Sequence, residues 1–240
     1  MIEVVGLVKR YGRTPVLRGV DLRVRRGRVT AIVGPNGAGK TTLIKAILGL
    51  ARPDGGRIAV DGVPLDGGVD YRARIGYMPQ IARFPENLSG AELLALLADL
   101  RRGGGSGAVA PDEELVERFR LRAQLDQPLR TLSGGTRQKV NAVMAFLFHP
   151  DLLFLDEPTA GLDPVASSIL KDKVLAERAG GRTFVLTSHI MSELEELADD
   201  VAFMLDGRVR FCGPLEELKR ATRQANLERA IAQMMTQEAA

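Results

Sequence analysis

Apolar positions along the chain form short runs that end at glycine or at charged residues. Two runs, "TAIVG" (30–34) and "LLFLD" (152–156), are apolar at consecutive positions, as strands are when a parallel sheet is covered on both faces. Strands are predicted over 2–6, 16–24, 29–33, 58–60, 75–78, 152–156, 183–188, 201–205 and 208–212. Helical spacing predicts helices over 39–50, 91–101, 112–121, 134–148, 166–178, 191–197, 215–221 and 226–235. This alternation predicts an α/β fold with a mainly parallel sheet flanked by helices.

The pattern becomes purely helical between about residues 83 and 148, which predicts a helical subdomain inserted into the α/β core. Within it, "RRGGGSGA" (101–108) has a composition that resists packing, and we expect a mobile break there. The core is expected over 1–82 and 149–213, and the tail over 214–240 is expected to form one or two amphipathic helices.

Composition limits the classes of function. The 240 residues carry 33 basic and 30 acidic side chains, a net charge of +3 that does not favour nucleic acid as a partner. A single cysteine, Cys212, and two histidines allow neither a disulfide framework nor a Cys/His metal site. Because the N-terminus lacks a signal-peptide core and no stretch approaches about 18 apolar residues, we expect a cytoplasmic protein. Another chain would have to supply any membrane spans.

The strongest chemical motif is "GPNGAGKTT" (34–42), which satisfies G-x-x-x-x-G-K-[ST] between a predicted strand and a predicted helix. Backbone N–H groups of residues 37–42 are expected to wrap phosphates, with Lys40 reaching the β- and γ-phosphates. Thr41 is expected to hold Mg²⁺, and Thr42 to contact the α-phosphate. A merely tight turn is the alternative, which the fixed residues and their context disfavour. The predicted nucleotide contacts of this loop are Gly34, Asn36, Gly37, Ala38, Gly39, Lys40, Thr41 and Thr42.

Two adjacent acids end the buried strand in "DLLFLDEP" (151–158), a costly arrangement unless the charges are paired. Asp156 is predicted to act on Mg²⁺ or its bound water, and Glu157 to polarise the attacking water. Solvated acids at a strand end are the alternative. His189 follows the strand "TFVLTS" and is predicted to meet the γ-phosphate, because ligands bind outside the carboxyl ends of parallel strands. His149 is expected to be structural.

Three further signals remain. "LSGGTRQKV" (132–140) opens a helix with paired glycines, which usually means that an anion approaches the backbone closely. Tyr11 in "VKRYG" could stack on a purine base, although taken alone it is better explained as a surface or core tyrosine. Gln80, after the strand "IGYMPQ", could sense metal or water.

Taken in this order, the motifs resemble the nucleotide-binding subunit of an ATP-binding cassette (ABC) transporter from about Tyr11 to Gly213, with "LSGG" (132–135) as the most specific element. The resemblance implies ATP and Mg²⁺, and a P-loop NTPase core with antiparallel strands at the N-terminus and an inserted helical subdomain. It implies that Tyr11 stacks on adenine and that Asp163 lies on a loop crossing a dimer interface. The residues that it assigns to hydrolysis are Glu157, His189, Lys40 and Gln80. Those that it assigns to the metal are Thr41, Gln80 and Asp156.

The resemblance also implies what the second glycine-rich helix start binds. In this family a second copy pairs head to tail, so that Ser133, Gly134 and Gly135 complete the ATP site of the partner. Thr136 stands where many members carry glutamine, and its shorter side chain bears on the partner-side sugar or phosphate contact. The backbone contribution of the two glycines does not depend on that side chain.

These features predict an ATPase that drives a separately encoded membrane permease from the inner face of the cell membrane. The phrasing "LDPVASSILKDKVL" resembles exporter-type subunits, including those serving copper-site assembly of nitrous-oxide reductase. The main alternative is a soluble ABC-type mechanical ATPase acting on nucleic acid or ribosomes, which the near-neutral charge and the single cassette disfavour. A P-loop kinase or GTP switch is disfavoured by "LSGG" and His189.

Overall fold

A computed structural model describes residues 1–103 and 110–238 of the chain. It divides into two compact units: Met1–Tyr71 with Arg178–Ala240, and Arg72–Glu177. The helical subdomain expected over 83–148 falls inside the second unit, which also contains strands. Most of the predicted break at 101–108 lies outside the described residues, and the helix before it runs to Gly103.

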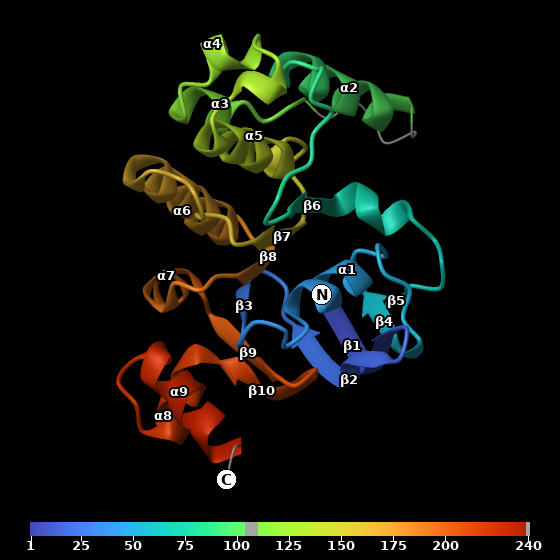
Figure 1. Cartoon of the computed structure of the whole chain (residues 1–240), viewed down its shortest axis with the longest axis vertical. Helices are drawn as coiled ribbons and strands as arrows, with labels where there is room; N and C mark the ends of the chain where they lie inside the picture. Colours follow the sequence, from blue (N-terminus) through green and yellow to red (C-terminus); the bar gives the residue numbers. More distant parts are fainter. Residues whose placement is uncertain (104–109, 239–240) are drawn as a thin grey trace. The chain divides into compact units, whose positions relative to one another are not determined.

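An antiparallel sheet opens the first unit (Figure 1). Its first strand runs on to Tyr11, past the predicted end at residue 6. A register shift against the second strand between Val4 and Leu7 interrupts the alternation of buried positions, which explains why the predicted strand ended too early. Such a bulge moves the buried face from even-numbered to odd-numbered positions. In the order β2-β1-β4-β5, the strands are β1 (Ile2–Tyr11), β2 (Thr14–Val24), β4 (Gly55–Val60) and β5 (Val63–Pro64).

The second sheet of the first unit is mainly parallel. β3 lies between β8 and β9 and runs parallel to both, while β10 pairs antiparallel with β9. All five residues of β3 and of β8 are buried, as their continuous apolar runs predict. The strands are β3 (Val29–Val33), β8 (Thr183–Thr187), β9 (Asp200–Leu205) and β10 (Arg208–Pro214).

The helices of the first unit follow the predicted order. One or two helices were predicted for the tail, and it forms two. The second of them packs near α7 (Figure 1). The predicted helix 39–50 ends earlier, at Ile47, and Gly49 has a φ of 68°. The helices are α1 (Lys40–Ile47), α7 (Met191–Leu197), α8 (Leu215–Thr222) and α9 (Leu227–Glu238).

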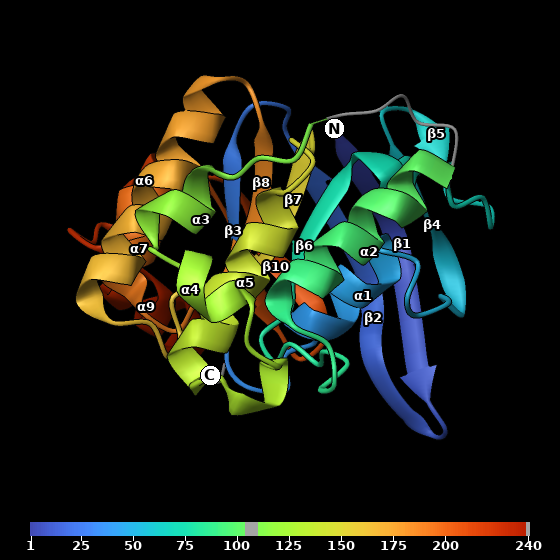
Figure 2. The ribbon, with the colours of Figure 1, turned by 90° about the horizontal axis from the view of Figure 1, so that it is seen from above.

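The second unit combines a parallel strand pair with helices that gather around α5 (Figure 2). The helix predicted over 112–121 is present but shorter, because Arg120 has a φ of 55°: it ends at Arg118, and a second helix that was not predicted begins at Arg122. Of the buried leucines here, Leu115 lies on the first helix, Leu125 on the second, and Leu121 at the N-cap of the second. The elements are η1 (Asp70–Arg74, which begins in the first unit), β6 (Ile75–Met78), α2 (Gly90–Gly103), α3 (Glu114–Arg118), α4 (Arg122–Leu125), η2 (Leu129–Thr131), α5 (Gly134–Phe146), β7 (Leu152–Asp156) and α6 (Pro164–Ala179).

The structure confirms the predicted α/β class with antiparallel strands at the N-terminus. Across residues 1–103 and 110–238, no helix has both the length and the apolar character that a membrane span needs.

Candidate nucleotide-binding site

The phosphate-binding motif lies on the loop between β3 and α1, where the sequence predicts it. Two of its glycines have backbone conformations that side chains rarely adopt: φ is 151° at Gly34 and 103° at Gly39. A Cβ at Gly34 would collide with the carbonyl group of Met204, and a Cβ at Gly39 would lie 2.9 Å from Cδ2 of Leu17. Glycine is therefore required at both positions for conformation and for space.

Lys40 begins α1 and turns back over this loop. Its Nζ donates hydrogen bonds to the carbonyl oxygens of Gly34 at 2.7 Å and Pro35 at 3.1 Å. The first turn of α1 carries no acidic side chain, and Gly39 at the N-cap offers no side-chain acceptor. Because the first N–H groups of a helix lack intrahelical acceptors, this start suits the oxygens of a phosphate chain.

The turn after β8 leaves the same sheet edge as the phosphate loop. Ala31 of β3 pairs with Leu186 of β8 in parallel register, so both strands send their carboxyl ends to one edge. Ser188 is buried; its hydroxyl donates to Oε2 of Glu193 at 3.4 Å and accepts from the N–H of Ile190 at 3.0 Å. The next residue, His189, is exposed at this edge, as predicted.

Tyr11 ends β1 in the same unit. Its side chain is exposed, and the ammonium group of Lys9 lies 5.3 Å from the centre of its ring. An exposed aromatic ring at a strand end can offer a face to a purine base.

In the second unit, β6 and β7 bring Gln80 and the two acids to a common edge. Met78 pairs with Leu155 in parallel register, so the residues that follow both strands lie at their carboxyl ends. Asp156 and Glu157 are 3% and 8% exposed, whereas Gln80 is exposed. Burial, and after it the negative charge of Asp156, raise the pKa of Tyr77 to about 12.

Ser133 caps α5 and leaves the helix start open. Its Oγ accepts from the N–H of Thr136 at 3.2 Å and lies 2.9 Å from Oγ1 of the same residue. A Cβ at Gly134 would meet nothing within 4 Å, while one at Gly135 would lie 3.1 Å from the carbonyl oxygen of Gly161. Thr136, the departure from the family pattern, thus bonds to its own chain's Ser133.

Asp163 has a role within its own chain that the sequence did not reveal. Its Oδ1 accepts from the N–H of Ala166 at 2.8 Å near the start of α6, and its Oδ2 lies 3.0 Å from Nζ of Lys139 on α5. The hydrogen bond from Ala166, followed by that from Lys139, holds the pKa of Asp163 below its usual range. The predicted interface loop is therefore fastened to the helix that carries "LSGG".

The sequence analysis also missed two buried amides on α5, Gln138 and Asn141. They lie on the side of α5 opposite Val140 and Val143, a side that helical spacing predicts to be polar and exposed, so their burial had no signal in the sequence.

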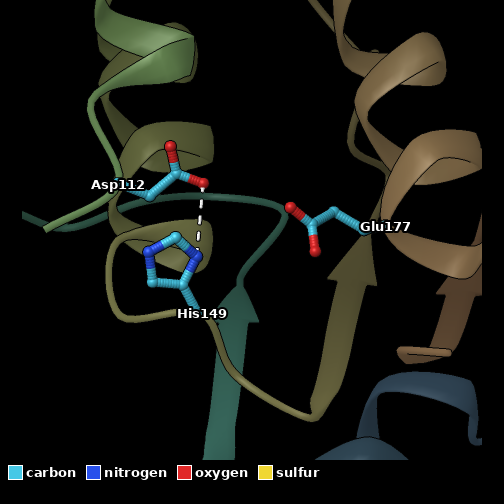
Figure 3. Close-up of side chains that lie close together, drawn as sticks. All are labelled: Asp112, His149 and Glu177. Atoms are coloured by element: carbon cyan, nitrogen blue, oxygen red, sulfur yellow. Dashed lines mark ion pairs between the residues drawn. The ribbon is translucent and has the colours of Figure 1, made fainter. Parts of the chain in front are cut away.

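A mixed cluster in the second unit has the residue types of a metal site. Asp112, His149 and Glu177 each place a ligand atom within 4.8 Å of the others, and Figure 3 shows Asp112 and His149 facing each other while Glu177 reaches in from α6. However, Nζ of buried Lys173 lies 2.7 Å from both Asp112 Oδ2 and Glu177 Oε1 and 2.6 Å from Glu114 Oε2. A cation of the chain already binds these carboxylates, so we assign the cluster to stability, as expected for His149.

The buried parallel strand, the glycine-rich loop and the helix that begins at Lys40 define a P-loop nucleoside triphosphatase fold. The family model for the ABC transporter matches residues 17–160, more than half of the chain. The chain therefore belongs to the ABC transporter family, as an ATP-binding subunit.

Individual relatives agree. The daunorubicin resistance ATP-binding protein DrrA3 of Streptomyces coeruleorubidus is 41% identical over 222 residues, which cover 92% of this chain and 70% of that protein. The Nod factor export ATP-binding protein I of Ralstonia nicotianae is 36% identical over 221 residues, which cover 91% and 68%. A solved structure described as the ATP binding subunit of an ABC transporter superposes with a TM-score of 0.88 at 34% identity, covering 98% of this chain and 99% of the other.

Proposed function

We propose that this chain hydrolyses ATP to ADP and phosphate, and that two copies couple ATP-driven closure to the movement of a separate export permease. The observation that carries the proposal is that one chain has both a closed phosphate loop before α1 and an exposed helix start at Ser133 and Gly134. A chain that binds phosphate with the first start has no evident use for the second unless another molecule supplies the anion. Relatives named for export support the direction of transport.

ATP is proposed to bind with its phosphates on the N–H groups of residues 37–42 and on the Lys40 ammonium, and with adenine against Tyr11. The donor set fits Mg²⁺, because Thr41, Gln80 and Asp156 offer the hard oxygen atoms that this ion prefers. When bound, Mg²⁺ supplies positive charge that neutralises the phosphate oxygens.

The chain's own groups then serve the displacement of ADP by water. Glu157 orients the attacking water and accepts its proton while the new bond to the γ-phosphorus forms and the bond to the β–γ bridging oxygen breaks. Lys40 stabilises the charge on the γ-phosphoryl oxygens, and His189 is proposed to donate a hydrogen bond to them.

The remaining donors are proposed to come from a second, head-to-tail copy. Ser133 and the N–H groups of Gly134 and Gly135 on one chain would contact the γ-phosphate held by the other. The open space on the Cβ side of Gly134 supports this role, because a Cβ there would meet no atom within 4 Å.

The permease is proposed to bind near Gln80 and the segment "ARFPENL" (82–88), beside strongly exposed Ile81. This places the protein at the inner face of the cell membrane, in the cytoplasm. A specialisation in copper-site assembly of nitrous-oxide reductase stays a prediction about the transported cargo. Co-purification of the permease, followed by identification of the proteins bound with it, would test this prediction.

Mixing two inactive variants tests the shared site. Lys40→Ala removes the phosphate contact, and Ser133→Arg blocks the helix start, so each protein alone should be inactive. Random pairing should restore up to about a quarter of wild-type ATPase activity, because half of the dimers are mixed and each has one intact site. No recovery in samples shown to contain mixed dimers would contradict a site completed by the partner.

Glu157→Gln tests the catalytic carboxylate. This variant should bind ATP yet hydrolyse it slowly, so that a dimer-sized species accumulates in size-exclusion chromatography with ATP and Mg²⁺. A protein that stays monomeric under saturating nucleotide would contradict the proposed closure.

A further inference from the structure

Two amide side chains lie in the interior beneath the helix that carries "LSGG". Asn141 is 2% exposed and Gln138 is 8% exposed, on the α5 face that also buries Ala142 and Ala145 and lies opposite Val140 and Val143. A buried amide without hydrogen bonds costs more stability than an apolar side chain of the same shape. These two amides therefore need hydrogen-bond partners, and those partners identify the segments that the amides connect to α5.

Asn141 connects α5 to the end of β6. Its Nδ2 donates to the carbonyl oxygen of Pro79 at 2.9 Å, an ordinary hydrogen-bond length, and lies 3.4 Å from Oε1 of Gln138. Pro79 is the residue directly before Gln80. The position of the Gln80 backbone is thus tied to α5.

Gln138 connects the same helix to the turn after β7. Its Nε2 lies 3.3 Å from the carbonyl oxygen of Pro158 and 3.5 Å from that of Glu157, and these are long, weak bonds compared with the one to Pro79. The two amides form one chain of hydrogen bonds between the segments that carry Gln80 and Glu157.

The backbone of Glu157 needs such support. Its φ of 53° lies in the left-handed region, which a residue with a side chain adopts only at a cost of about 1 kcal/mol or more. The N–H of Ala160 also donates to the Glu157 carbonyl oxygen, at 3.2 Å. Because Gln138 and Ala160 share this acceptor, the conformation of the turn depends on α5 as well as on local bonds.

We infer that Gln138 and Asn141 are positioning residues that hold the Gln80 segment and the Glu157 turn in a fixed arrangement on the helix that begins at Ser133. A displacement of α5 then reaches both segments through this pair. The inference rests on the proposed function, because it assigns the pair to the geometry of Glu157 during hydrolysis.

Gln138→Met and Asn141→Leu test the pair, since each removes the amide and keeps much of its volume. With the full-length chain, kcat for ATP hydrolysis should fall at least about tenfold, because small misplacements of a reacting group are costly. Binding of a fluorescent ATP analogue should stay within about twofold of wild type, because the phosphate loop belongs to the other unit. Gln127→Met, at an exposed glutamine of the same unit, is the matched control and should leave both values unchanged.

A double-mutant cycle separates positioning from general destabilisation. In a Glu157→Gln background, adding Gln138→Met should lower the residual rate less than about twofold, because the group being positioned is already gone. If Gln138 only stabilised the fold, Gln138→Met would lower the rate in proportion to the loss of folded protein, and it would do so equally in the wild-type and Glu157→Gln backgrounds. Thermal melting measures the folded fraction. Gln138→Met decides the matter by itself if Asn141→Leu does not fold.

The outcomes distinguish this inference from the function on which it rests. If Glu157→Gln hydrolyses ATP at the wild-type rate, the role proposed for Glu157 fails. If Glu157→Gln is slow but folded Gln138→Met retains the wild-type kcat, only the positioning role fails. Equal losses from Gln138→Met with and without Glu157 would also overturn it.

Discussion

The two glycine-rich helix starts of this chain differ in what surrounds them. Before α1, Gly34 and Gly39 have no room for a side chain, and the Lys40 ammonium binds carbonyl oxygens of the loop itself. Before α5, Ser133 and Gly134 are exposed, and Gly134 has open space around it. The first start is therefore shaped by its own chain, whereas the second keeps its shape by a local cap and offers its surface to another molecule.

The largest effect is expected from a side chain in the closed start. Gly34→Val would force a collision with the Met204 carbonyl, so the loop must move and ATP-analogue affinity should fall at least about a hundredfold. Fluorescence titration with the analogue measures this loss. Gly62→Ala is the control, because Gly62 also has a positive φ, of 78°, but has nothing within 4 Å. Normal binding by Gly34→Val would show that the loop is not closed as described.

The second-largest effect concerns the stability of the unit that carries the open start. Lys173 is 3% exposed and binds Asp112, Glu114 and Glu177, so Lys173→Met removes the cation that these three carboxylates share, and Glu114 keeps only its ion pair with Arg118. The free energy of unfolding should fall by about 2–4 kcal/mol, somewhat less than for a fully buried pair because Glu114 is half exposed. Urea denaturation measures the change, and exposed Lys45→Met should have little effect.

The stability difference between wild type and Lys173→Met should depend on pH. Burial, the largest single effect, would raise the pKa of Asp112, but the hydrogen bonds from Lys173 and from the N–H of Glu114, with the charge of Lys173, together hold it below the ordinary 3.8. Its stabilising contribution is therefore present above about pH 4 and is lost as the pH falls through the folded-state pKa. The pKa of Lys173 is raised despite its burial, by Asp112, Glu114 and Glu177, so its contribution persists until the solution is more alkaline than its ordinary 10.5. The stability gap between wild type and Lys173→Met should narrow in acid and stay constant between pH 6 and 9; a gap that is unchanged at pH 3 would contradict the assignment.

Only part of the contrast between the two helix starts could be predicted from the sequence. Strand β3, the loop that follows it and the start of α1 were predicted because all of their signals are local: consecutive apolar residues, glycines at fixed spacing and Lys40. The strand of Asp156 was predicted for the same reason. The crowding at Gly34 could not be predicted, because it comes from Met204, 170 positions away in the chain.

Other misses have the same physical origin. The bulge in β1 occurs in its pairing with β2, and Arg120, with its φ of 55°, separates buried Leu115 on α3 from buried Leu125 on α4. Asp163 and Lys139, and likewise Asn141 and Pro79, meet through contacts between elements that no periodicity encodes. The motif residues were therefore predictable, and the side chains that support them were not.

A smaller effect is expected from the cap of the open start. Ser133→Ala removes the acceptor for the Thr136 N–H and should lower the free energy of unfolding by about 1 kcal/mol. No matching side-chain cap exists at α1, where Gly39 occupies the N-cap. Ser168→Ala, exposed within α6, is the control and should be neutral or slightly stabilising. Chemical denaturation compares the two, and a neutral Ser133→Ala would mean that the start of α5 does not depend on this cap.

The smallest effect on the isolated chain is expected from Gly134→Ala, and it tests the comparison most directly. The added methyl group meets nothing within 4 Å, and Gly134 has no positive φ, so folding and ATP-analogue binding should change by less than about 0.5 kcal/mol. If a partner's phosphate approaches the backbone at this point, the same methyl group occupies its path, and ATPase activity should fall while the monomer remains intact. Gly135→Ala serves for contrast, because its methyl group also presses on the Gly161 carbonyl oxygen at 3.1 Å and should cost stability as well. Full activity in Gly134→Ala, at protein concentrations where wild type dimerises, would mean that no ligand comes close to the open start.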